Sequence, residues 1–215
     1  MDWNPTTHYK DVAVAQRYDS ERFSGLAGRV FDALEKRAIR RAFAGILRNA
    51  IVMDLPCGTG RLAETLLEQG FHVVGIDISA AMLHVAERKL ERFGSRFETL
   101  VSDVHELARK QQAVYDVALC ARVLMHFPLE EQITFLRSVA HLTKGRVVFT
   151  QSLSTPYQRL RRRVKRLLGN PPSAVYPITD EELKALLAGA GLREVRRSRP
   201  LPFLSEAMFV IAEPG

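Results

Sequence analysis

The sequence contains little that would place it in a membrane, secreted or metal-binding class of protein. No apolar run approaches the roughly 18 to 20 residues of a membrane span, and the polar first residues are not those of a signal peptide. The two cysteines, Cys57 and Cys120, are too few for a disulfide scaffold or a four-ligand zinc site, and we expect buried thiols. The histidines are scattered without metal-ligand spacing. We therefore expect a cytoplasmic globular protein with no metal site.

Nucleic acid is not the expected partner, although the chain carries a net charge of +7. Lys and Arg outnumber Asp and Glu by 9 to 6 in residues 1–49 and by 11 to 6 in residues 151–215, whereas residues 50–150 are balanced at 11 to 12. Aromatic residues do not alternate with the basic ones, and no RNA-binding domain is recognisable. The basic flanks indicate an anionic substrate or an anionic surface, or only a solvated face that favours solubility.

Strand-like and helix-like segments alternate through the middle of the chain. Apolar residues recur at helical spacing over 26–48, ahead of this region. Strands are then expected at 51–54, 72–77, 97–101, 115–120 and 146–150, with helices at 60–69, 80–93 and 129–142. Strands and helices at this spacing form βαβ units. We therefore expect a parallel sheet that is covered by helices on both faces.

The C-terminal part of the chain departs from this alternation. Thr179 and Glu182 form a capping-box pattern, which predicts a helix that ends near Gly189 or Gly191. Two strand-like runs follow, at 192–198 and 207–212. We expect them to close the sheet as an antiparallel pair.

A basic insert, residues 152–178, precedes that helix. Residues 157–168 within it have an amphipathic pattern, with a cationic face opposite an apolar stripe made by Leu160, Val164, Leu167 and Leu168. Such a helix can dock its apolar stripe on the domain as a lid, which is the favoured interpretation. The alternative is a helix that lies on an anionic membrane surface.

A glycine-rich turn joins the first strand to the following helix. Gly58 and Gly60 let the backbone approach a ligand closely at a helix N-terminus. Together with Ala63, and with Asp77 nineteen residues after Gly58, they also satisfy the fingerprint of a dinucleotide site. An NAD-binding oxidoreductase is therefore an alternative on this pattern alone.

Charge near this turn favours a different ligand. Asp54 ends the strand, and Pro56 removes a backbone donor. Both are unfavourable beside a pyrophosphate, but they suit a ligand whose nearest groups are cationic. S-adenosylmethionine (SAM) carries a sulfonium and an ammonium group.

The region 50–150 resembles class I SAM-dependent methyltransferases. These residues lie in segments that are similar to that family's motifs and that follow one another in the same order. The segment that begins at Asp54 resembles the first motif, with Pro56 in place of its first glycine. Asp77 ends a segment similar to the second motif, whose acid binds the ribose hydroxyls. Asp103 lies in a segment similar to the third motif, whose acid accepts from the adenine amino group.

The resemblance also implies further contacts with SAM. It places Ile78 and Met82 near the adenine. Tyr18 lies in a segment similar to one whose tyrosine closes over the methionine end of the cofactor, or it only packs an N-terminal helix. The implied cofactor residues are Tyr18, Asp54, Pro56, Gly58, Gly60, Asp77, Ile78, Met82, Asp103, Val104 and Cys120.

Methyl transfer requires mainly alignment of the reacting groups, and no elaborate catalytic cluster is visible. An oxygen nucleophile needs a base to take its proton. His126, just past the fourth strand, is the candidate, with a structural or substrate-contact role as the alternative. The sequence signature of enzymes that methylate the amino group of adenine is absent. Where that signature would stand, at the end of the fourth strand, the chain has Cys-Ala-Arg-Val.

These observations predict one α/β domain over residues 1–215, with a doubly wound, seven-stranded, mostly parallel sheet. Its expected parts are an N-terminal helical cap (1–49), a SAM-binding core (50–150), the basic lid insert (152–178) and a closing helix with antiparallel strands (179–215). The expected function is methyl transfer from SAM to an O or N atom of a small acceptor, anionic or lipid-like. The alternatives are an NAD-binding oxidoreductase and a catalytically silent SAM-binding partner protein.

Overall fold

Seven strands form one sheet in the order β3-β2-β1-β4-β5-β7-β6 in the computed structural model of the chain. The structure describes residues 25–167, 169, 175–199 and 207–215. The strands are β1 (Ile51–Asp54), β2 (His72–Asp77), β3 (Phe97–Val101), β4 (Val117–Cys120), β5 (Val147–Ser152), β6 (Leu192–Ser198) and β7 (Ala207–Pro214). Strands β1 to β5 pair in parallel, and β7 pairs antiparallel with both β5 and β6. The predicted mostly parallel sheet and its antiparallel closing pair are confirmed.

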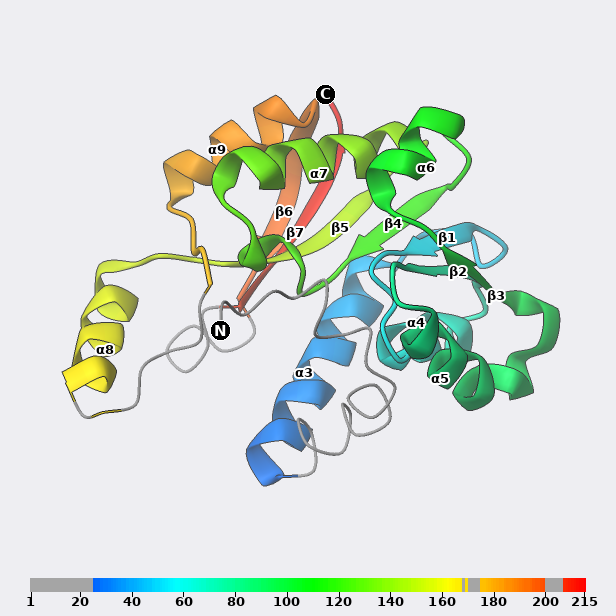
Figure 1. Cartoon of the computed structure of the whole chain (residues 1–215), viewed down its shortest axis with the longest axis horizontal. Helices are drawn as coiled ribbons and strands as arrows, with labels where there is room; N and C mark the ends of the chain where they lie inside the picture. Colours follow the sequence, from blue (N-terminus) through cyan, green and yellow to red (C-terminus); the bar gives the residue numbers. More distant parts are fainter. Residues whose placement is uncertain (1–24, 168, 170–174, 200–206) are drawn as a thin grey trace.

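Helices cover both faces of this sheet (Figure 1). The α-helices are α3 (Leu26–Ala42), α4 (Arg61–Glu68), α5 (Ala80–Leu90), α6 (Val104–Lys110), α7 (Leu129–Leu142), α8 (Pro156–Leu167) and α9 (Asp180–Gly189), with short 3₁₀ helices η1 (Glu91–Arg96) and η2 (Leu124–His126). Helices α3, α4 and α5 pack on one face, and α6, α7 and α9 on the other. None of the described helices is both long and apolar enough to cross a membrane.

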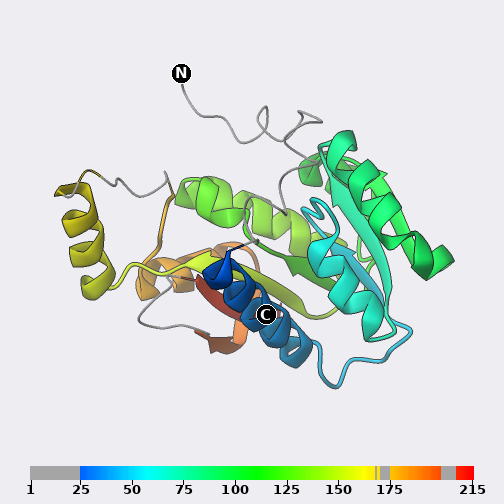
Figure 2. The ribbon, with the colours of Figure 1, turned by 90° about the horizontal axis from the view of Figure 1, so that it is seen from below.

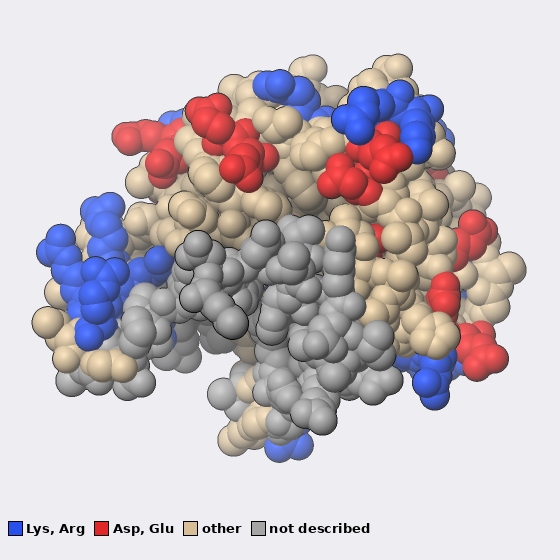
Figure 3. Space-filling model, in the orientation of Figure 1, with Lys and Arg blue, Asp and Glu red and all other residues tan. Residues whose placement is uncertain are grey.

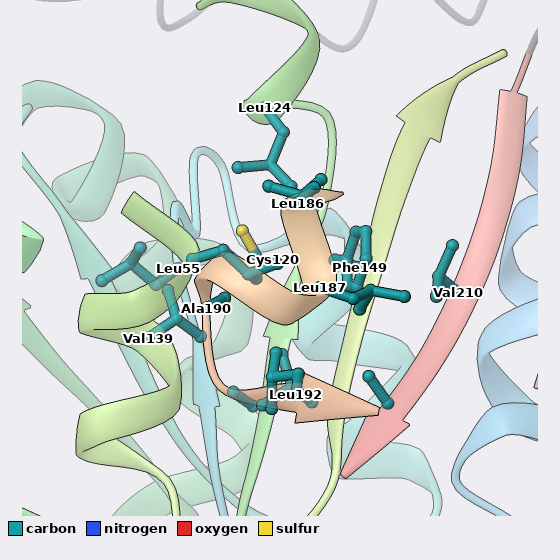
Figure 4. Close-up of a cluster of buried hydrophobic side chains, with 14 of the residues drawn as sticks. Leu55, Cys120, Leu124, Val139, Phe149, Leu186, Leu187, Ala190, Leu192 and Val210 are labelled. Atoms are coloured by element: carbon teal, nitrogen blue, oxygen red, sulfur yellow. The ribbon is translucent and has the colours of Figure 1, made fainter. Parts of the chain in front are cut away.

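The core consists of two clusters of buried side chains, one on each face of the sheet, because successive strand residues point to opposite sides. In one cluster, Leu186 and Leu187 of α9 pack with Phe149 of β5 and Val210 of β7 (Figure 4). In the other, α3, α4 and α5 cover residues such as Val52. Burial on both faces explains why the central strands are almost continuously apolar.

Several boundaries differ from the sequence expectations. Helix α3 ends at Ala42 rather than near residue 48, and α5 ends at Leu90, where η1 takes over and Gly94 leaves the helical conformation. Helix α6 was not expected, because seven residues with two buried side chains give too weak a periodic signal. Asp103 caps it by accepting hydrogen bonds from two backbone N–H groups.

The predicted amphipathic helix is present as α8, but its apolar stripe is not docked on the domain. Leu160 is 61% exposed, Val164 46% and Leu167 86%, while Gln158, on another side of the helix, is buried. Both ribbon views place α8 apart from the sheet and its covering helices (Figures 1 and 2). The expectation of a docked stripe is therefore wrong for these three residues. Leu168 lies outside the described residues, as does the N-terminal segment that contains Tyr18.

Candidate functional site

A pocket opens where β1, β2 and β4 end. In the strand order, β2 lies on one side of β1 and β4 on the other, so the connections leave in opposite directions, and such a switch point forms a crevice in an open α/β sheet. The pocket is lined by Asp54, Pro56, Cys57, Gly58, Thr59, Arg61, Leu62, Asp77, Ile78, Met82, Ala121, Arg122, Val123, Met125, His126 and Phe127.

The two glycines of the turn have different structural roles. Both have left-handed φ values, 54° at Gly58 and 71° at Gly60. A Cβ atom at Gly60 would lie 2.7 Å from a methyl group of Leu90, whereas one at Gly58 would meet no atom within 4 Å. Gly60 therefore allows α4 to pack against α5, and Gly58 leaves the backbone open toward the pocket.

Asp77 connects the end of β2 to the turn. Its Oδ2 accepts a hydrogen bond of 2.9 Å from the backbone N–H of Gly58, and its Oδ1 accepts one of 2.9 Å from Ser79. Burial raises the pKa of this carboxyl, and the hydrogen bonds from backbone N–H groups partly oppose that rise. An ionised carboxylate has about four lone-pair sites, so Asp77 retains acceptor capacity toward a ligand in the pocket.

Asp54 is a buried carboxylate at the base of the same pocket. It is 1% exposed, and its Oδ2 has no hydrogen-bond partner among the described residues. Burial raises its pKa to about 7, with a contribution from the charge of Asp77, while the Cys57 thiol and Arg61 oppose the rise. A buried acceptor without a partner is costly. A cationic ligand in the pocket would relieve that cost.

The structure brings together most of the predicted site residues. Those that line the pocket are Asp54, Pro56, Gly58, Asp77, Ile78, Met82 and His126. Gly60 lies behind the turn, and Val104 and Cys120 lie in the core cluster on the α7 side of the sheet. Asp103 is exposed, and its side chain caps α6.

Both cysteines are buried free thiols, as expected. Burial raises the pKa of each thiol, and the carboxylate of Asp54 adds to both rises. They are therefore protonated at neutral pH and unsuited to nucleophilic chemistry. In the part of the chain that the structure describes, no cluster of three or more His, Cys, Asp or Glu residues could hold a metal ion.

Two arginines in the pocket lining were not predicted as site residues. Arg61, the first residue of α4, forms ion pairs with Asp32 and Glu35 of α3, and Glu35 also lies 3.5 Å from Arg122. Arg61 directly follows the glycine-rich turn, which is a signal that sequence reasoning could have used. The pairing of Arg122 with Glu35 joins residues far apart in the chain, and local sequence pattern carries no sign of it.

Comparison with known proteins shows what this arrangement is. The profile of a methyltransferase domain matches residues 52–145. A ubiquinone biosynthesis O-methyltransferase from Bordetella parapertussis is 32% identical over 146 residues, which cover 62% of this chain and 60% of the relative. The matched segment, residues 52–145, belongs to this methyltransferase domain family. The match decides against the oxidoreductase alternative for the glycine-rich turn.

Other members of the family extend this result. A chloroplastic magnesium protoporphyrin IX methyltransferase from Arabidopsis thaliana is 30% identical over 164 residues, which cover 73% of this chain and 49% of the relative. The chain thus spans about half to three fifths of the length of these two relatives.

Solved methyltransferase structures confirm the predicted fold. The magnesium protoporphyrin IX methyltransferase from Synechocystis PCC 6803, with bound S-adenosylhomocysteine (SAH), superposes with a TM-score of 0.76 at 22% identity, covering 97% of this chain and 99% of that one. The 1,6-didemethyltoxoflavin-N1-methyltransferase from Burkholderia thailandensis gives 0.67 at 21% identity, covering 100% and 92%.

Proposed function

We propose that this protein transfers a methyl group from SAM to an O or N atom of a small anionic acceptor. The observation that carries the proposal is the buried Asp54 carboxylate, which faces the pocket beside Asp77. Two carboxylates in a partly dehydrated pocket attract a ligand with a sulfonium and an ammonium group, since opposite charges interact more strongly away from water. The relatives support the class of reaction, because their names include O- and N-methyltransferases.

Different pocket residues contact different parts of SAM. Asp77 accepts from the ribose hydroxyls, and Gly58 allows close backbone contact with the ligand. Ile78, which is partly exposed, and Met82 flank the adenine. Asp54 faces the cationic end of the ligand.

Four other predicted residues remain proposals that rest on the family resemblance. Asp103 and Val104 begin α6 and would contact the adenine from that helix. Cys120 would act through packing at the end of β4. Tyr18 lies outside the described residues, and its closure over the methionine end is a prediction.

SAM supplies a methyl group on a good leaving group, so the protein contributes mainly alignment, which can lower the barrier by about 7 to 11 kcal/mol. His126, the last residue of η2, lines the pocket and can take the acceptor's proton. Its neighbours Val123 and Phe127 line the pocket as well and make that side apolar. The two buried free thiols fit a reducing cytoplasm, where we place the reaction.

The test uses SAM that carries an isotopically labelled methyl group, incubated with the protein and a pool of small metabolites. Mass spectrometry follows both SAH release and labelled products. We expect a labelled product with an anionic group and more than tenfold slower turnover for His126→Ala, with SAH affinity unchanged. Binding of SAH without any labelled product would instead identify a silent SAM-binding partner protein. Unchanged turnover of His126→Ala would remove the base role.

The exposed face of α8 supports a second proposal, contact with an anionic membrane surface from which a lipid-like acceptor could be drawn. The stripe of Leu160, Val164 and Leu167 is exposed, and Arg163 and Arg166 on the same helix are exposed as well. Lys and Arg side chains gather over α8 (Figure 3). Apolar residues that enter the headgroup region, flanked by arginines that pair with lipid phosphates, are typical of interfacial helices.

Flotation with vesicles tests this contact. We expect salt-sensitive binding to mixed phosphatidylglycerol and phosphatidylcholine vesicles, none to phosphatidylcholine alone, and loss of binding in Leu160→Gln/Leu167→Gln. Leu47→Gln is the matched control, because Leu47 is equally exposed but lies outside α8. Equal binding by the double variant and the control would contradict the proposal.

A further inference from the structure

Arg122 has a backbone conformation that few residues other than glycine adopt. Its φ is 64°, and Ala113 is the other non-glycine residue in the described part of the chain with a positive φ. Its N–H donates a hydrogen bond of 2.7 Å to Oγ1 of Thr150, on the neighbouring strand β5. Unfavourable backbone conformations persist where the surrounding structure imposes them, often at binding sites. Here the bend follows the end of β4, and the residue lines the pocket.

Helix α3 supports the Arg122 side chain from outside the pocket. Nη1 of Arg122 lies 3.5 Å from Oε2 of Glu35, and its Cζ lies 5.4 Å from the centroid of the Phe31 ring. Glu35 is buried and also forms an ion pair with Arg61. The guanidinium is therefore held between a carboxylate and an aromatic ring, which restricts its orientation.

A fixed cation in this pocket needs a physical explanation. Asp54 and Asp77 give one part of the pocket a negative charge, which suits the sulfonium of SAM. The guanidinium of Arg122 disfavours that sulfonium when both are present. Glu35 lies close to this guanidinium but is also paired with Arg61, so one carboxylate is shared by two cations, and a further negative group beside Arg122 would be favourable. An anionic group on the methyl acceptor would be such a group. Arginine is well suited to that role, because its planar donors match a carboxylate in a bidentate geometry.

The remaining lining beside Arg122 indicates what the rest of the acceptor resembles. Val123, Met125 and Phe127 are apolar, and His126 is placed among them. An acceptor with an apolar body and one carboxylate fits this composition.

We propose that Arg122 binds a carboxylate on the methyl acceptor and so determines which acceptors enter the pocket. This inference rests on the proposed function, because it assumes that SAM occupies the side of the pocket near Asp54 and Asp77.

The test measures binding of benzoate and of its uncharged analogue benzamide to SAH-saturated protein, by ligand-observed NMR at millimolar concentration. The protein is compared with Arg122→Asn, because asparagine tolerates a left-handed φ and carries no charge. Arg122→Gly, which also accepts this φ, is used if the asparagine variant does not fold. Arg40→Gln is the matched control for net charge, since Arg40 lies on α3 in an exposed ion pair with Glu68.

We expect benzoate to bind the native protein and the control at least tenfold more tightly than benzamide. In Arg122→Asn the two probes should bind within twofold of each other, with SAH affinity changed by less than threefold. Equal binding of the probes by the native protein, no binding of either, or a preference that survives in the Arg122 variants would overturn the inference. Failure of the native protein to bind SAH would instead overturn the proposed function, and it is measured first.

Discussion

Asp77 lies at the end of β2, and its Oδ2 accepts a 2.9 Å hydrogen bond from the backbone N–H of Gly58 in the turn after β1. The bond joins two segments that both line the pocket. It fixes the turn relative to the neighbouring strand without any ligand. The site is therefore formed in advance, which reduces the entropy that a ligand must lose on binding.

Asp77→Asn should weaken SAH binding by at least tenfold. An amide can replace only one of the two carboxylate oxygens that accept from Gly58 and Ser79, and hydrogen bonds to a charged group contribute about 1.5 to 3 kcal/mol each. Calorimetric titration measures the change. Asp103→Asn is the comparison, because asparagine preserves the cap of α6. Unchanged affinity in that variant would show that Asp103 only caps the helix.

Binding of SAH should become weaker at lower pH. The pKa of Asp54 is raised to about 7, and attraction of the ammonium group of SAH requires the ionised form. Affinity should therefore fall by about eightfold between pH 7.5 and pH 6, because the carboxylate of the free protein takes up a proton over this range and must release it when the ligand binds. Calorimetry at both pH values checks this, and Asp54→Asn should bind weakly with no such dependence. A pH-independent affinity in the native protein would contradict the assigned role of Asp54.

Asp54 should also destabilise the ligand-free protein at neutral pH. Its pKa is 3.8 ordinarily and about 7 in the folded chain, so the folded state holds the proton more tightly than the unfolded state. The contribution to stability is present below pH 4 and is lost as the pH rises to about 7. At about 1.4 kcal/mol per pKa unit, the loss is at most about 4 kcal/mol.

Asp54→Asn should therefore raise the free energy of unfolding at pH 8 while it weakens ligand binding, a trade expected at functional sites. Urea unfolding at pH 5 and pH 8 measures the change in stability, and calorimetric titration measures the change in ligand binding. A variant that is less stable than the native protein at pH 8 would contradict this.

The two glycines of the turn should respond differently to alanine. Gly60→Ala combines a left-handed φ with a Cβ 2.7 Å from Leu90 and should lower the free energy of unfolding by about 2 to 4 kcal/mol. Gly58→Ala has only the φ to accommodate and should cost about 1 to 2 kcal/mol. Gly58→Ala should nonetheless weaken SAH binding, because its methyl group points into open space at the pocket. Thermal unfolding and SAH titration of both variants distinguish the roles, and equal destabilisation would be inconsistent with them.

Three ion pairs join helices α3 and α4, because Arg61 pairs with Asp32 and Glu35, and Arg40 pairs with Glu68. Two of these pairs, Arg61–Glu35 and Arg40–Glu68, differ clearly in burial. Glu35→Gln removes the buried carboxylate beside Arg61 and should cost about 3 kcal/mol, because it leaves a buried charge poorly compensated. Glu68→Gln breaks the half-exposed pair with Arg40 and should cost less than about 1 kcal/mol. Denaturant unfolding of the two variants provides the comparison. Similar small costs would show that α3 is not held by Glu35.

The strands and the acids that follow them could be predicted because parallel strands buried on both faces form apolar runs, whose carboxyl ends share one edge. Asp54 and Asp77 were found in this way. The orientation of the Asp103 side chain could not be predicted. It is determined by the cap of α6, and the sequence pattern of that short helix is too weakly periodic to show it. The pairing of Arg122 with Glu35 is a tertiary contact that no local pattern encodes. The local pattern of α8 likewise predicts an apolar stripe but does not determine whether that stripe packs on the domain or is exposed.

The central claim is that Asp54 and Asp77 make this pocket a site for a cationic nucleoside. Calorimetric titration of the native protein and of Asp54→Asn with SAM, and separately with NAD, tests it most directly. We expect saturable binding of SAM by the native protein, at least tenfold weaker binding by Asp54→Asn, and no binding of NAD. Binding of NAD without SAM, or equal SAM affinity in the two proteins, would contradict the claim.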